Sequence, residues 1–465
     1  MISFRGLRGG TWTGAAAFAA LALVPLAASA QDLATTQDVP QSADGLADVP
    51  NPSFWEGGGV RIGQDTILHP GVSVTGSYQS NVFFQDSKDG PAGPISSPLL
   101  RFGVGASWAT ITPGRMEIEA PSGTDTSLQK ITFNLDASLE WDQYLSSDSA
   151  VTDQNDLGIS FLGDVKFNPQ GALTLDLRDG FVRNVTPGQS LRENADRDRN
   201  ELDATAHFKP GGGALDFYLG YQFIVDVFEA SILDYENRTS HQGTLGVRWQ
   251  WLPHTALGLE GDLATVNPSN EELKSKSTPL RVSATLSTLL TPVFGAIVSA
   301  GYGKGFYASG EDVSTWLAGA ELRYAVGPTL RTAVGYSHDF ADALIGNFYI
   351  DHTLYARASA QLGARWQIRA KGEVRFRDYG GIHDAPSIML IFCGDASCGK
   401  FRNDVLPRVE LGTDYALLPW LLIGASYIFQ DDSTDFFVQS SVNPAAKDSG
   451  AFTWHELDIR LQARW

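Results

Sequence analysis

The feature that most constrains this chain is a strict two-residue alternation of apolar and polar side chains. It is clearest at the end of the sequence, where Leu457, Ile459, Leu461, Ala463 and Trp465 alternate with charged or amide residues. A β-strand turns successive side chains to opposite faces, so this period gives one apolar and one charged face. A soluble β-sandwich shows the same pattern, so this stretch alone does not separate a sandwich from a membrane barrel.

The alternation repeats along the chain from about residue 72, and no segment has the 3.6-residue period of a helix. The sequence therefore predicts an all-β fold of about 18 strands. The predicted strands are 68–83, 98–109, 129–144, 155–167, 172–184, 197–209, 214–227, 239–251, 255–266, 278–290, 294–305, 312–325, 329–340, 347–361, 365–378, 403–416, 420–430 and 451–465. Residues 111–129 form a long link where a short turn is expected, which leaves about 16 or 20 strands as alternatives.

The connections between these strands alternate in length. Tight turns with Pro or Gly lie near residues 168, 210, 253, 291, 327, 363 and 419, and longer polar segments lie between them. Short turns on one side and long loops on the other are typical of an outer-membrane barrel. Strands of ten to fifteen residues and aromatic residues near strand ends also favour a membrane barrel over a sandwich or propeller. We predict a single transmembrane antiparallel up-and-down β-barrel over residues 66–465.

The N-terminus predicts export from the cytoplasm. Arg5 and Arg8 precede a short apolar run that ends at Ala28-Ser29-Ala30, which indicates a secretory signal peptide over residues 1–30. The alternative, a membrane-anchoring helix, needs about 20 apolar residues. Residues 31–65 form an acidic leader without a sustained period, and we expect it to lie in the periplasm of a Gram-negative bacterium.

Composition and motifs exclude several classes of function. The formal net charge of −19 argues against a nucleic-acid partner, because phosphate binding needs clustered Lys and Arg. The sequence has no Gly-x-Ser-x-Gly or His-Glu-x-x-His motif, so we predict neither an enzyme nor a cofactor or metal site. Cys393 and Cys398 form a disulfide-closed loop or stay free thiols; an oxidising compartment favours the disulfide. His338, His352 and His455 fall on the predicted lipid face.

The polar face of the strands predicts a pore lining that is mixed in charge. The candidate pore-lining residues are Arg281, Arg323, Arg331, Arg357, Arg369, Lys371, Arg375, Arg377, Asp136, Glu140, Asp216 and Tyr218. Basic residues come mostly from the second half of the chain and acidic ones from the first half, which predicts a transverse field across the lumen. The alternative is a set of internal ion pairs, with Glu373, Glu410 and Asp414 as partners of the basic stripe on strand 365–378.

The first predicted strand resembles the opening of a known porin family. Its Tyr78-Gln79-Ser80-Asn81-Val82-Phe83 matches the Tyr-x-x-Asn-Val/Ile-Phe element of the β-barrel porin 2 family. Chain length and leader are also similar to those of the exopolysaccharide-export porins of myxobacteria. The resemblance implies an outer-membrane conduit for a secreted polysaccharide, with a periplasmic export protein and an inner-membrane synthase as partners. A general diffusion porin, and a barrel hydrolase or adhesin, are the alternatives.

The terminal strand has a second predicted role. Strand 451–465 is expected to pair with the strand near residue 72 and close the sheet, which removes its edges. Trp465 is then expected at the periplasmic interface, where the barrel-assembly machinery recognises terminal aromatic residues in similar proteins.

Overall fold

The computed structural model describes residues 59–63, 65–84, 94–110, 129–184, 197–229, 231–326, 329–343, 346–363, 365–381, 402–435, 437–439 and 447–465. The predicted signal peptide, most of the predicted leader, and Cys393 and Cys398 lie outside these ranges. Within them, no helix is long and apolar enough to cross a membrane.

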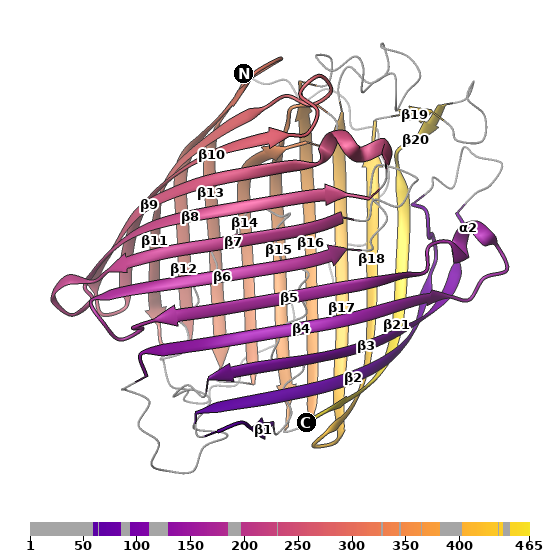
Figure 1. The fold of residues 1–465 in the computed structure, drawn as a ribbon, viewed down its shortest axis with the longest axis horizontal. Helices are drawn as coiled ribbons and strands as arrows, with labels where there is room; N and C mark the ends of the chain where they lie inside the picture. Colours follow the sequence, from indigo (N-terminus) through magenta and orange to yellow (C-terminus); the bar gives the residue numbers. More distant parts are fainter. Residues whose placement is uncertain are drawn as a thin grey trace.

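Eighteen long antiparallel strands form a closed barrel (Figure 1). They are β2 (Thr66–Gln79), β3 (Ser97–Thr110), β4 (Ile131–Tyr144), β5 (Asp156–Phe167), β6 (Leu173–Asn184), β7 (Arg197–Phe208), β8 (Leu215–Phe228), β9 (Arg238–Leu252), β10 (Thr255–Pro268), β11 (Ser277–Thr291), β12 (Phe294–Tyr307), β13 (Val313–Val326), β14 (Leu330–Asp342), β15 (Phe348–Leu362), β16 (Trp366–Gly380), β17 (Asn403–Leu418), β18 (Leu421–Thr434) and β21 (Phe452–Arg464). The fold prediction is confirmed: each of the eighteen predicted ranges coincides with one strand to within a few residues at its ends.

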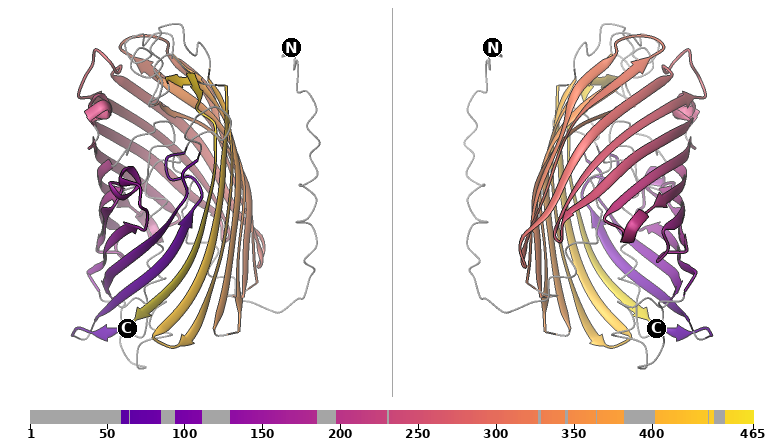
Figure 2. Two further views of the ribbon diagram at one scale, coloured as in Figure 1. Left: turned by 90° about the vertical axis from the view of Figure 1, so that its right-hand side faces the viewer. Right: turned by 90° about the vertical axis from the view of Figure 1, so that its left-hand side faces the viewer.

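The barrel closes where the sequence predicted. Each strand from β2 to β18 pairs with the next, and β21 pairs with both β18 and β2. Figure 2 shows the indigo first strand of the barrel beside the yellow last strand. The closing register joins Gly71 to Arg464 and Gln79 to Glu456. Because the sheet meets itself, the long strands leave no unpaired edge.

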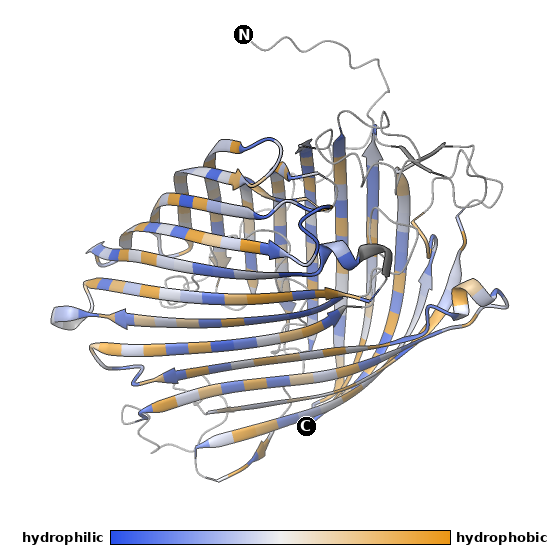
Figure 3. Cartoon of the chain, turned by 45° about the horizontal axis from the view of Figure 1, so that its top comes forward, coloured by the Kyte–Doolittle hydropathy of each residue, from blue (hydrophilic) through white to orange (hydrophobic). Residues whose placement is uncertain are grey.

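Apolar side chains cover the outside of the barrel. Leu245, Leu219 and Val334 are 67%, 63% and 61% exposed, and Figure 3 shows hydrophobic and hydrophilic bands alternating along the strands. A water-soluble protein buries such a surface, whereas a bilayer covers it. The outer face is therefore built to contact lipid.

Short elements sit at the two ends of the barrel. β1 (Val60–Arg61) pairs with the start of β2, and β19 (Phe437–Gln439) pairs with β20 (Lys447–Ser449). Within the described ranges, the helical pieces are α2 (Ser149–Thr152), η4 (Pro210–Gly212) and η5 (Ser231–Glu236). We call the end where β2 begins and β21 stops the turn end, and the opposite end, which carries α2 and η5, the loop end.

Candidate functional site

The inner face of the barrel is the candidate site, because it carries the polar half of the alternating strands. On β16, Trp366 and Phe376 are each 45% exposed on the outside, and Arg369 and Arg377 alternate with them. The same parity places all twelve candidates on the inner face: Asp136 and Glu140 on β4, Asp216 and Tyr218 on β8, Arg281 on β11, Arg323 on β13, Arg331 on β14, Arg357 on β15, and Arg369, Lys371, Arg375 and Arg377 on β16. Their role in lining an open pore stays a prediction.

Local carboxylates neutralise most of the basic side of the lumen. The ion pairs join Arg369 to Asp414 (2.6 Å), Arg375 to Glu373 (2.8 Å), Lys371 to Glu373 (3.3 Å), Arg377 to Asp351 (2.8 Å) and Arg357 to Glu321 (3.1 Å). Arg323 also contacts Glu321. Four carboxylates therefore compensate these six cations locally, as in the alternative of internal ion pairs, with Glu373 and Asp414 among the expected partners. Glu410 pairs with Arg408 at 2.7 Å instead, and the transverse field stays a prediction.

The acidic side is compensated differently. Glu140 pairs with Arg101 at 2.7 Å, and Asp216 lies 3.1 Å from the ring of His207. Three further carboxylates, Asp203, Glu260 and Asp262, accept hydrogen bonds from neutral donors instead. Within the described ranges, no ion pair joins these three carboxylates to a cation. Neutral donors therefore hold these three carboxylates, while Arg178 and Arg281 are the cross-strand neighbours of Asp203 and Asp262.

The neutral donors come from neighbouring strands. Gln222 Nε2 donates to Asp203 at 2.9 Å, and the Tyr218 hydroxyl donates to Glu260 at 2.6 Å. Thr244 Oγ1 donates to Asp262 at 2.6 Å. All of these residues line a cavity of about 470 Å³ on the inner face, which extends from β7 to β14. The cavity lining thus combines hydroxyl, amide and carboxylate groups with the guanidinium groups of Arg199 and Arg281 and a few apolar side chains.

At the loop end, the tip of the β14–β15 hairpin lies inside the barrel. β13 and β14 pair only as far as Ala318 and His338, whereas β14 and β15 stay paired out to Asp342 and Phe348. Phe340, which strand parity places on the outer face of β14, is 2% exposed and packs with Val313 and Phe348. We call residues 339–343 and 346–350 the hairpin tip.

Two glycines make room for the tip. A β-carbon built on Gly303 would lie 2.5 Å from Cε1 of Phe340, and one on Gly305 would lie 3.2 Å from Cε2 of the same ring. Gly303 and Gly305 face the lumen, because Tyr302 and Phe306, which flank them on β12, are exposed outside. The Phe340 ring therefore sits on the inner face of β12, and the tip narrows the lumen at the loop end.

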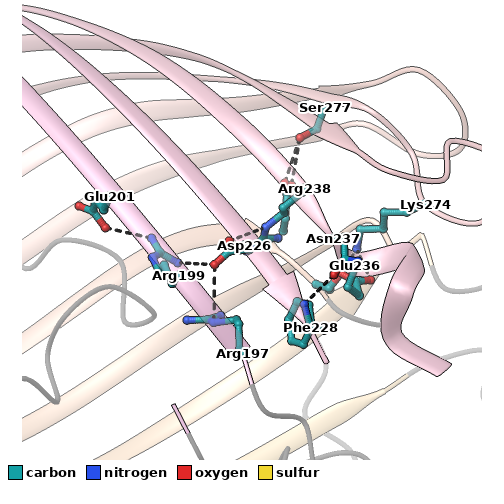
Figure 4. Close-up of polar contacts among 12 residues, drawn as sticks. Arg197, Arg199, Glu201, Asp226, Phe228, Glu236, Asn237, Arg238, Lys274 and Ser277 are labelled. Carbon is teal, nitrogen blue, oxygen red and sulfur yellow. Dashed lines mark hydrogen bonds and ion pairs between the residues drawn. The ribbon is translucent and has the colours of Figure 1, made fainter. Parts of the chain in front are cut away.

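A buried lysine fastens the tip to the opposite loops, and Figure 4 shows this residue, Lys274, beside Glu236. Lys274 is 5% exposed, lies 3.5 Å from Glu236, and donates hydrogen bonds to the carbonyl oxygens of Ala343 and Gly346. Burial raises the pKa of the Glu236 carboxyl, and the nearby cations Lys274 and Arg238 oppose that rise. Sequence reasoning missed Lys274 and Glu236, because both lie in connections and no periodicity marks them.

The tip has three further attachments. Tyr307 and Ser277 donate to the Asp342 carboxylate at 2.8 and 3.0 Å. Arg281 pairs with Asp339 at 3.3 Å and donates to the Phe340 carbonyl oxygen at 2.6 Å. Side chains from β11 and β12 therefore fix the position of the hairpin tip together with Lys274.

Next to Lys274, three arginines surround one aspartate (Figure 4). Asp226 is 1% exposed and lies 3.0 Å from Arg238 and 3.6 Å from both Arg197 and Arg199. Arg199 also reaches Glu201 at 3.2 Å. Buried charges persist only when they are paired, so this network holds the loop ends of β7, β8 and β9 together.

The outer-face histidines pair with tyrosines. The Tyr336 hydroxyl lies 2.9 Å from Nδ1 of His352, and the Tyr427 hydroxyl lies 2.8 Å from Nδ1 of His455. His338 is 4% exposed and lies 3.2 Å from His352. The predicted lipid-face placement holds for His352 and His455, whereas His338 is enclosed between strands. Within the described residues, no group of three or more His, Cys, Asp or Glu side chains is arranged to hold a metal ion.

The last residue lies at the turn end of the barrel, where β21 pairs with β2. Trp465 is 47% exposed and stacks on Trp420 with an interplanar angle of 11°. Its backbone N–H donates to the carbonyl oxygen of Pro70 at 3.0 Å. The predicted position of Trp465 beside the first strand is confirmed, and recognition by an assembly machinery stays a prediction.

Comparisons with known proteins find distant likenesses in structure only. No protein-family model matches the chain, and no curated protein sequence matches it. Among solved structures, OccK5 (OpdH) of Pseudomonas aeruginosa has a TM-score of 0.43 at 9% identity, covering 86% of this chain and 98% of its own. OpdK of the same organism, bound to vanillate, has a TM-score of 0.43 at 10% identity over 86% and 99%. A bacterial polysaccharide outer membrane secretin has a TM-score of 0.33 at 10% identity over 84% and 97%. The assignment as a membrane barrel therefore rests on the chain's own geometry.

Proposed function

We propose that this protein is an outer-membrane channel that serves as a conduit for a hydrophilic polysaccharide leaving the cell. The observation that carries the proposal is the contrast between the two faces of one closed wall. The outside is apolar and suits lipid, whereas the inner cavity is lined by hydroxyl, amide and carboxylate groups. A barrel of this strand number encloses an aqueous channel. The role involves no chemical step.

The resemblance of Tyr78–Phe83 to exopolysaccharide-export porins supports the choice of substrate. It implies a periplasmic export protein that delivers the polymer to the turn end, and passage to the cell surface at the loop end. The asymmetry of the connections supports that orientation, because the tight turns of outer-membrane barrels face the periplasm. Lipid of the outer membrane and the barrel-assembly machinery are the remaining proposed partners.

Deletion of the gene tests the proposal in the cell. Loss of surface polysaccharide, restored by the wild-type gene on a plasmid, is the expected result. Unchanged surface polysaccharide in the deletion strain contradicts the export role. Planar-bilayer recording of the purified barrel tests the channel separately, because a protein that inserts without conducting is not an open conduit.

A diffusion porin for small hydrophilic solutes is the second candidate, and one observation favours it. The hairpin tip lies across the inner face of β12 and narrows the lumen, which suits small molecules better than a polymer chain. Liposome swelling in small sugars, without a polysaccharide defect in the deletion strain, would support this alternative.

A further inference from the structure

Two inner-face tyrosines share one three-strand arrangement. Tyr218 on β8 covers Gly246 on β9 and donates its hydroxyl to Glu260 on β10 at 2.6 Å. Tyr355 on β15 repeats the pattern with Gly335 on β14 and Glu321 on β13, again at 2.6 Å.

Each ring lies against the wall. A β-carbon built on Gly246 would lie 2.1 Å from Cζ of Tyr218, and one on Gly335 would lie 2.3 Å from Cζ of Tyr355. The rings thus occupy the space of the missing side chains, and the hydrogen bond to glutamate fixes their direction. Both tyrosines are half-buried, so the wall covers one side of each ring and the lumen side stays accessible.

Side chains that can hydrogen-bond to a ligand lie beside each tyrosine ring. Beside Tyr218, the Asp262 carboxylate is held by Thr244 at 2.6 Å and by Gln242 at 3.3 Å. Beside Tyr355, the guanidinium of Arg357 pairs with Glu321 at 3.1 Å and is itself half-exposed to the lumen. A flat aromatic face bordered by fixed hydrogen-bonding groups matches the chemistry of a pyranose, which has C–H bonds on its faces and hydroxyls around its rim.

We propose that Tyr218 and Tyr355 are stacking platforms for the sugar rings of a saccharide that passes through the lumen. This inference rests on the proposed conduit and names its contact residues. The negative face of an aromatic ring attracts the weakly positive C–H groups of a sugar. The hydroxyl of each tyrosine is already engaged with a glutamate, so the ring face is the part of the side chain that can meet a ligand.

The two tyrosine platforms differ in the charge of the sugar that they favour. Tyr218 lies among carboxylates that are hydrogen-bonded by neutral donors, so it disfavours acidic sugars. Tyr355 lies beside Arg357, whose guanidinium contacts Glu321 and is half-exposed to the lumen, where it can meet a sugar carboxylate. The second platform therefore accepts uronic acids and neutral sugars alike, and neutral oligosaccharides suit both.

The test is block of single-channel current in planar bilayers by maltohexaose and by cellohexaose. Tyr218→Leu and Tyr355→Leu should each shorten the residence time of the blocking sugar by roughly three- to tenfold, the range expected for loss of one aromatic contact. Tyr218→Phe and Tyr355→Phe keep the ring and should retain most of the residence time. Heat-modifiable migration on gels establishes that each variant is folded.

Tyr144 provides a matched control. It lies on the inner face of β4, but it is only 6% exposed, and its hydroxyl donates to Gln79 at 3.0 Å. Tyr144→Leu should leave sugar block unchanged. An open wild-type channel that neither sugar blocks, or folded Tyr218→Leu and Tyr355→Leu channels with unchanged residence times, overturns the inference. Neither outcome bears on the export role, which the deletion strain tests.

Discussion

Replacing Lys274 by Met should release the hairpin tip. The methionine keeps much of the apolar stem but removes the donor to the carbonyls of Ala343 and Gly346 and the partner of Glu236. Removing one partner of a buried ion pair costs about 3–5 kcal/mol. A loss of about 3 kcal/mol raises the ratio of released to docked tip by roughly a hundredfold, since each 1.4 kcal/mol is tenfold.

The assay is single-channel recording of the reconstituted barrel. We expect the Lys274→Met channel to show a state of larger conductance, or longer dwell times in such a state, because the docked tip occupies space on the inner face. The double variant Lys274→Met with Glu236→Gln avoids an unpaired buried carboxylate and should release the tip less often, because only the hydrogen bonds to the two carbonyl oxygens are then lost. Lys276→Met makes the same chemical change two residues along and serves as the control.

A second substitution should displace the hairpin tip from the side where it packs against β12. Gly303→Val places a side chain where the Phe340 ring lies and should displace the tip without touching Lys274. Gly295→Val is its control, because a β-carbon at Gly295, on the same face of β12, meets nothing nearer than 3.5 Å. Folded Lys274→Met and Gly303→Val channels with wild-type conductance and dwell times would refute the reasoning.

Three further predictions follow from individual groups. The pKa of Glu236 is raised in the docked state, so docking of the tip is coupled to proton uptake. Lowering the pH on the loop side should therefore favour the docked tip and make large-conductance openings rarer. Glu236→Gln should remove this pH dependence. Replacing Asp203, Glu260 and Asp262 by their amides should lower the cation preference measured as a reversal potential in a KCl gradient, and an unchanged potential would place the selective carboxylates elsewhere. Trp465→Asp should reduce stable insertion, measured as loss of the heat-modifiable band from outer-membrane fractions, because a charge at this interface opposes membrane contact.

The fold could be predicted because its signal is local. A two-residue period over ten or more positions identifies a strand and its two faces, and turn chemistry identifies where it stops. The inner-face placement of Arg369 and Asp136 follows from the same parity. Glu373 could be proposed as a partner because it lies two residues from Lys371 and from Arg375 on the same face of one strand. Asp414 could be proposed because the register brings its strand alongside.

The hairpin tip could not be predicted, because parity gives the opposite answer. Alternation places Phe340 on the lipid face, and it does lie on the outer face of its own hairpin. It is buried because that hairpin overlaps the inner face of β12 and β13, a contact between segments that no local pattern joins. The burial of Lys274 has the same origin, since an isolated lysine in a polar loop reads as a solvated side chain.

The hairpin tip separates the two candidate functions. A polysaccharide chain must pass the loop end, so an export conduit requires that the docked tip move aside at some stage of transport. A diffusion porin for small solutes works with the tip in place and gains selectivity from it. A Lys274→Met channel that admits longer oligosaccharides than the wild type, and that restores surface polysaccharide to a deletion strain that lacks it, fits the conduit. The same variant with increased leakage of small solutes, in a strain whose surface polysaccharide is unchanged even by deletion of the gene, fits the porin, because the tip then acts as a fixed filter.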